Sequence, residues 1–181
     1  MNVRLITLGV FVLGGIAPAR AHVLDEYLQA TFISVEKDQL KADLFLTPGV
    51  AVLPAVLAEI DTDGNGTFSE SEQRTYAERV VKDLSFAVND TALVPRLRSF
   101  DFPTLQQLRD GRGDIHLEFT VKVAGSEPNR KFRFENRHQS QIAAYQVNCL
   151  ATRDPGIRIG TQHRNNLQST YELEVVVRQN G

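Results

Sequence analysis

Side chains that carry oxygen are concentrated in one stretch of the sequence, Asp61 to Glu72. The stretch reads Asp-Thr-Asp-Gly-Asn-Gly-Thr-Phe-Ser-Glu-Ser-Glu and contains neither histidine nor cysteine. Carboxylate, amide and carbonyl oxygens are the ligands of hard cations, whereas softer metals prefer nitrogen and sulfur. The residue types and their spacing therefore predict a site for a hard cation.

This stretch resembles the calcium-binding loop of the EF-hand family, and the resemblance extends over residues 50–84 when the flanking segments are included. Gly66 stands at the sixth position, where the family uses glycine for the sharp turn that wraps the chain round the ion. The family pattern implies ligands at six positions, which are here Asp61, Asp63, Asn65, Thr67, Ser69 and Glu72.

The resemblance also implies how each ligand acts. The first three would supply side-chain oxygens, Thr67 its backbone carbonyl, and Ser69 a contact through water. Glu72 would offer both carboxylate oxygens from the first turn of the exiting helix, which suits calcium better than octahedral magnesium. We therefore expect Ca²⁺ as the bound ion; the alternative is an acidic turn that merely joins two helices.

Phe68, at the eighth position, resembles the apolar residue with which family members pair two loops. No second loop is visible in the sequence. A single loop must either dimerise with another copy or lean on the structure beside it.

The first residues have the character of an export signal. Arg4 supplies a positive start, Leu5 to Ile16 is apolar, and Ala17 to Ala21 ends in an Ala-x-Ala cleavage pattern. We expect residues 1–21 to be removed and the mature chain to begin at His22, in the periplasm or outside the cell. The apolar run is shorter than the roughly 20 residues that cross a bilayer, so no transmembrane segment is expected in the mature chain.

Cleavage before His22 would leave an α-amine beside an imidazole, which is the start of a copper-binding histidine brace. A brace needs one further histidine, and the candidates are His116, His138 and His163. A copper carrier or a copper-dependent enzyme is therefore the alternative function.

Other functions find little support in the sequence. A net charge of -2 gives no concentrated basic surface for nucleic acid. Cys149 is the only cysteine, so no disulfide can form within the chain, and its alternation with Tyr145 and Val147 predicts a buried, inert thiol. No phosphate loop, serine elbow or catalytic carboxylate pair is evident, so no enzymatic activity is predicted.

The elements that position the loop are predicted from periodicity. Apolar residues alternate with polar ones in several runs, which is typical of antiparallel strands with one buried face. These runs are residues 27–36, 40–46, 84–88, 115–123, 132–134, 145–149 and 171–177. Helical spacing replaces the alternation from Val50 to Ile60 and from Tyr76 to Leu84, on either side of the loop. We expect an α+β fold: one domain, residues 22–181, forming an antiparallel β-sandwich with an EF-hand helix–loop–helix inserted at residues 49–84.

The segments Ala21 to Ala30 and Leu46 to Val50, together with the loop, resemble the extracytoplasmic front portion of bacterial HupE/UreJ-type membrane proteins. Those proteins continue into hydrophobic helices, which this sequence does not contain, so a transport role is not implied. We expect calcium binding in a structural or interaction role; a protein partner is left open, and the sequence names neither that partner nor an oligomeric state.

Overall fold

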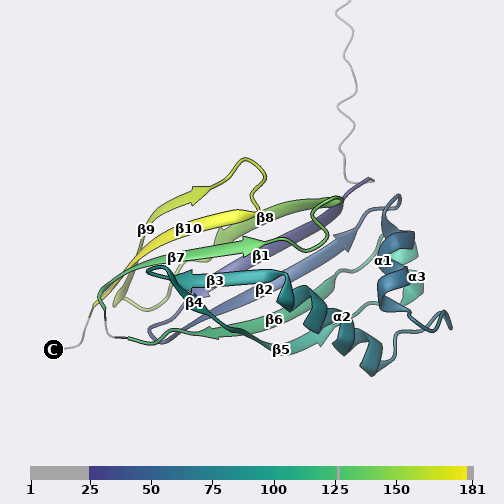
Figure 1. The fold of residues 1–181 in the computed structure, drawn as a ribbon, viewed down its shortest axis with the longest axis horizontal. Coiled ribbons are helices and arrows are strands. Elements are labelled where there is room, and N and C mark those ends of the chain that lie inside the picture. The colour runs from purple at the N-terminus through teal and green to yellow at the C-terminus, as the bar shows by residue number, and fades with distance from the viewer. Residues whose placement is uncertain (1–24, 126, 179–181) are drawn as a thin grey trace, which may run out of the picture.

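The computed structural model describes residues 25–125 and 127–178, and this part of the chain is mostly β. Figure 1 shows long strands running along the molecule, with the helices at one end. The strands are β1 Tyr27–Val35, β2 Gln39–Pro48, β3 Leu84–Val88, β4 Thr91–Leu93, β5 Pro95–Asp101, β6 Ile115–Lys122, β7 Asn129–Asn136, β8 Ala143–Cys149, β9 Ile157–Arg164 and β10 Thr170–Val177. The helices are α1 Leu53–Ile60, α2 Glu70–Lys82 and α3 Leu105–Arg109.

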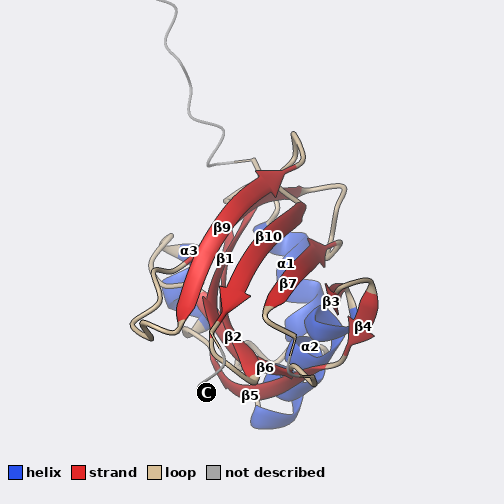
Figure 2. Ribbon diagram, turned by 90° about the vertical axis from the view of Figure 1, so that its left-hand side faces the viewer, coloured by secondary structure: helices blue, strands red, loops and turns tan. Residues whose placement is uncertain are grey.

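The strands form two sheets of five. The first, here called sheet A, has the order β5-β6-β2-β1-β8, and the second, sheet B, has the order β4-β3-β7-β10-β9. The two layers are visible end-on in Figure 2. Neighbouring strands are antiparallel with one exception, because β8 lies parallel to β1. The expectation of purely antiparallel sheets is wrong at this edge: the chain leaves sheet B after β7 and enters sheet A beside β1, in the same direction as β1.

One hydrophobic core joins the two sheets. In β1 every second residue is buried, the alternation that the sequence predicts for a strand with one dry face. Phe86 of β3 meets Phe119 of β6 across the core, with ring centroids 5.7 Å apart and an edge-to-face orientation. Burying one such ring stabilises the fold by about 1.5–3 kcal/mol. The arrangement is consistent with a β-sandwich.

Two helices occupy the connection between β2 and β3. Helix α1 begins with Pro54 in its first turn, where the missing N–H costs no hydrogen bond. Helix α2 begins at a capping box, in which the Ser69 side chain accepts from the Glu72 N–H and the Glu72 side chain accepts from the Ser69 N–H. The buried face of α2, with Tyr76 and Val80, packs against the core.

Several elements were not predicted. Strands β4, β5 and β9 and helix α3 lie outside the ranges expected from periodicity. β5 has no fully buried residue and its alternation is broken by a register shift between Leu97 and Ser99, while β9 buries only Ile157, so neither strand shows the regular alternation on which the prediction depends. Among the described residues, no helix has both the length and the apolar character needed to span a membrane.

Candidate metal centre

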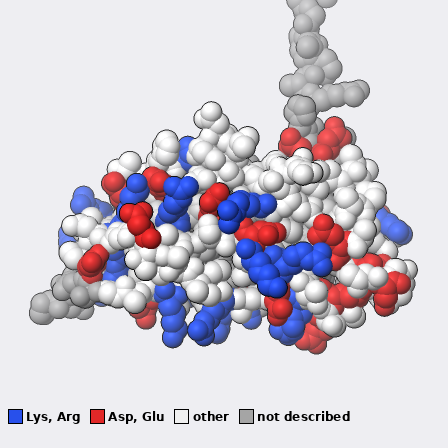
Figure 3. All heavy atoms as spheres, viewed as in Figure 1, with Lys and Arg blue, Asp and Glu red and all other residues white. Residues whose placement is uncertain are grey.

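The predicted ion site lies in the loop between α1 and α2, at the end of the molecule where acidic atoms gather in Figure 3. Asp61 caps the C-terminus of α1, and its N–H donates to the Leu57 carbonyl. Ser69 caps the N-terminus of α2, and Glu72 lies in the first turn of that helix. The first residue of the loop, Asp61, and the last, Glu72, are therefore each held by a helix end.

Three carboxylates converge across this loop. Asp61, Asp63 and Glu72 each place a carboxylate oxygen within 4.8 Å of the others. Within residues 25–125 and 127–178, no lysine or arginine forms an ion pair with any of the three. Like charges at this separation repel one another, so a cation would stabilise the arrangement.

The backbone of the loop curls round its own acidic side chains. The Gly66 N–H donates to Asp61 Oδ2 at 2.9 Å and the Asn65 N–H to Asp61 Oδ1 at 3.1 Å. Gly66 has a φ of +81°, a conformation that glycine adopts without steric cost. The Thr67 hydroxyl and N–H both donate to Asn65 Oδ1, at 2.6 and 2.8 Å. The side-chain oxygens of Asp61 and Asn65 therefore face the backbone of the loop.

Glu72 connects the two ends of the loop. Its Oε1 accepts from the Thr62 N–H at 2.7 Å, and its Oε2 accepts from the Ser69 hydroxyl at 2.7 Å and the Ser69 N–H at 3.0 Å. These bonds, those from Ser69 first and those from Thr62 second, lower the pKa of Glu72 to about 2. The carboxylate is therefore ionised at neutral pH, with both oxygens directed at the loop.

The loop leans on the rest of the domain through Phe68. Its ring packs edge-to-face on Phe102, with centroids 6.5 Å apart, and is partly buried against the core. The Gln73 amide donates to the Phe68 carbonyl at 2.7 Å. The residue that would pair two loops in the EF-hand pattern thus has a partner within this chain.

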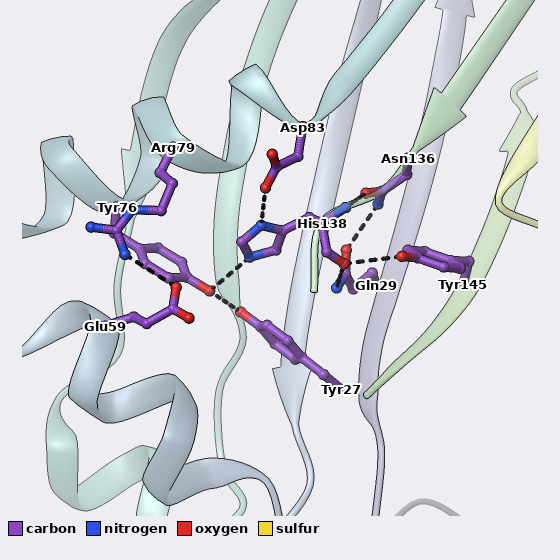
Figure 4. Close-up of polar contacts among 9 residues, drawn as sticks. All are labelled: Tyr27, Gln29, Glu59, Tyr76, Arg79, Asp83, Asn136, His138 and Tyr145. Carbon is purple, nitrogen blue, oxygen red and sulfur yellow. Dashed lines mark hydrogen bonds and ion pairs between the residues drawn. The ribbon is translucent and has the colours of Figure 1, made fainter. Parts of the chain in front are cut away.

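A buried polar network that the sequence did not reveal joins α2 to the sheets (Figure 4). The Tyr76 hydroxyl of α2 lies 2.7 Å from the Tyr27 hydroxyl of β1 and 3.2 Å from His138 Nε2. His138 Nδ1 lies 2.8 Å from Asp83 Oδ2. Its members are far apart in the sequence and form no short motif, so neither spacing nor periodicity could have identified them.

The protonation of the network follows from its geometry. Burial lowers the pKa of His138 from its ordinary value of 6.5, an effect that the hydrogen bond to the Asp83 carboxylate only partly opposes. A neutral His138 donates from Nδ1 to the Asp83 carboxylate and accepts at Nε2 from Tyr76, which in turn accepts from Tyr27. In this arrangement the hydroxyl protons of Tyr27 and Tyr76 and the Nδ1 proton of His138 are each donated to one acceptor. The bond between Tyr27 and Tyr76 connects α2 to β1.

The backbone next to His138 is fixed by amide side chains. The Gln29 amide and the Tyr145 hydroxyl donate to the His138 carbonyl, at 2.9 and 3.0 Å. The His138 N–H donates to Asn136 Oδ1 at 2.9 Å, and the Asn136 amide donates to Gln29 Oε1 at 2.9 Å. Since Gln29, Asn136 and His138 are all almost fully buried, the network holds the core in place and offers no open site for chemistry.

Of the predicted histidine brace, only the candidate second histidines lie within the described residues. His22 and the predicted export signal, residues 1–21, lie outside the described residues. Both ring nitrogens of His138 have hydrogen-bond partners, Tyr76 and Asp83. His116 lies on sheet A bonded to Asp43, and His163 is exposed on sheet B. Cys149 is half-buried, and burial raises the pKa of its thiol to about 11, which makes it a poor nucleophile.

Comparisons with known proteins add no relative from which a function could be transferred. No protein-family model, no curated protein and no solved structure matches this chain. The assignment of function therefore depends on the chemistry of the loop and of the side chains around it.

Proposed function

We propose that the chain binds one calcium ion through a single EF-hand, residues 49–84, in an exported β-sandwich protein. The observation that carries the proposal is the convergence of the Asp61, Asp63 and Glu72 carboxylates at the spacing of an EF-hand loop. Asn65, Thr67 and Ser69 complete the set of oxygen donors. Because all of them are hard oxygen ligands on a flexible loop, the site favours calcium over a transition metal.

The ion would have a structural role. Without it, three carboxylates repel one another between the end of α1 and the start of α2. With it, Glu72 is drawn toward Asp61 and the first turn of α2 is fixed. The same helix carries Tyr76 and ends next to Asp83, both of which bond His138 in the core. Order in the loop would therefore strengthen the attachment of α2 to the sheets.

The expected affinity is modest. If residues 1–21 direct export, the protein works where calcium is abundant, and extracellular EF-type modules bind with a Kd of roughly 10⁻⁴ to 10⁻³ M. The packing of Phe68 on Phe102 supports a site that works without a second loop. The proposal gives the chain no catalytic role.

Calorimetric titration of calcium into chelator-treated protein tests the proposal. We expect one site per chain, with binding lost in Glu72→Gln because glutamine keeps the size of the side chain and removes its charge. Glu70→Gln is the matched control, since Glu70 lies in the same helical turn and pairs with Arg74 rather than with the loop. Absence of binding in the native protein, or equal loss in both variants, would overturn the proposal.

A further inference from the structure

A second group of metal-ligating side chains lies on the outer face of sheet A. Asp43 projects from β2, and His116 and Glu118 project from β6. Each residue places one potential ligand atom within 4.8 Å of the other two. None of the three takes part in the loop between α1 and α2 or in the buried network.

Strand register explains why the three side chains meet. Asp43 is the direct cross-strand partner of Glu118. His116 precedes Glu118 by two residues, so both project from the same face of β6. Side chains directly opposite in an antiparallel pair lie about 4.5–5.5 Å apart at Cβ, which is close enough for both to reach one ion.

Neighbouring groups already orient two of the three side chains. The His116 imidazole stacks on the Phe45 ring, with centroids 4.3 Å apart and an interplanar angle of 2°. This stack leaves His116 Nε2 facing Asp43 Oδ1 at 2.9 Å. Glu118 Oε2 accepts a hydrogen bond from the Ser99 hydroxyl at 2.8 Å, and this bond does not involve Glu118 Oε1.

We propose that Asp43, His116 and Glu118 form a second metal site, which binds a first-row transition-metal dication such as zinc. One imidazole nitrogen and two carboxylate oxygens are common zinc ligands, and three protein ligands leave a fourth tetrahedral position for water. The nitrogen donor separates this site from the calcium loop, whose donors are all oxygens. The site is open to solvent: the side chains of His116 and Asp43 are 26% and 35% exposed.

The acidic residues around the site favour a bound cation, and the basic residues oppose it. Asp43 and Glu118 are like charges in direct opposition, an unfavourable pairing that a dication would reverse. Asp101 is the cross-strand partner of His116 and adds negative charge on the same face. Arg98 and Lys41 line the same hollow of about 270 Å³ as Asp43 and Glu118, and their positive charges work against metal binding.

Calorimetric titration of zinc into the full chain, with calcium in excess to occupy the loop, tests the proposal. We expect one zinc ion per chain. Removing even an outer partner of a metal ligand costs about 10–100-fold in affinity, so His116→Gln and Glu118→Gln should each weaken binding at least about tenfold. Arg98→Gln should strengthen binding, because it removes an opposing charge without touching a ligand.

The controls separate this site from other ways of binding zinc. His163→Gln removes an exposed histidine on β9, and Glu72→Gln removes the calcium ligand; both should leave zinc affinity unchanged. His22→Gln should also have no effect, whereas a loss would assign the metal to His22. The proposal is overturned if His116→Gln, with an unchanged unfolding midpoint, binds zinc as the native protein does, or if a control variant loses binding.

Discussion

The hydroxyl of Tyr76 lies 2.7 Å from the hydroxyl of Tyr27, and this contact joins helix α2 to strand β1 inside the core. Both side chains are fully buried. Tyr76 lies one helical turn after Glu72, so the residue that would close the calcium loop and the residue that ties α2 to the sheets share one short segment. Fixing the loop at Glu72 would therefore also fix the turn of α2 that contacts the core through Tyr76.

Removing the Tyr76 hydroxyl should destabilise the protein more than removing that of Tyr27. Tyr76→Phe leaves His138 Nε2 and Tyr27 without their shared partner, and each buried unpaired polar group costs about 1–3 kcal/mol. Tyr27→Phe removes only the hydrogen bond that Tyr27 donates to Tyr76, and the bond between Tyr76 and His138 remains. Urea unfolding of both variants measures the difference, and an equal or larger loss in Tyr27→Phe would show that the order of donors is wrong.

Stability should fall on mild acidification. The pKa of His138 is lower in the folded protein than its ordinary value of 6.5, so the unfolded chain binds the proton more readily. This contribution is complete above pH 6.5 and is lost as the pH falls from 6.5 through the folded pKa, at no more than about 1.4 kcal/mol per pH unit.

Heteronuclear NMR of the imidazole, combined with unfolding at several pH values, checks this expectation. His138 should titrate below pH 6.5, and its neutral form should carry the proton on Nδ1. A resonance that titrates above pH 6.5 would mean that the Asp83 carboxylate outweighs burial, and stability would then be lost as the pH rises.

The capping box of α2 should stabilise the protein even without calcium. Ser69→Ala removes the N-cap and the hydroxyl that donates to Glu72, and loss of such a cap typically costs about 0.5–2 kcal/mol. Ser71→Ala, an exposed serine in the same helical turn, is the control and should change stability little. Denaturant unfolding in chelator makes the comparison; equal effects would show that the cap contributes nothing.

Periodicity predicted those strands that bury every second side chain. Alternation identified β1, β2, β6 and β10, and the mostly β character and the two sheets are confirmed. It failed for β5, whose side chains are all at least partly exposed because the strand lies at a sheet edge. The parallel pairing of β8 with β1 was also missed, since alternation shows which face is buried but not which strand lies alongside.

The part of the candidate site that is formed by neighbouring residues in the sequence could be predicted. The proposed ligands of the loop lie within twelve consecutive positions, so one sequence motif contains them all. The network around His138 combines Tyr27, Tyr76 and Asp83, which only the fold brings together. Asp43 and His116 likewise meet through strand pairing alone. Calcium binding and export remain predictions.

Unfolding of the mature protein in chelator and in calcium tests the central claim most directly. With a Kd of roughly 10⁻⁴ to 10⁻³ M, about 10 mM calcium should raise the free energy of unfolding by about 1.4–2.7 kcal/mol. The increase should be lost in Glu72→Gln and kept in Glu70→Gln. An unfolding midpoint that calcium leaves unchanged in the native protein would contradict the account and reduce the loop to a turn between two helices.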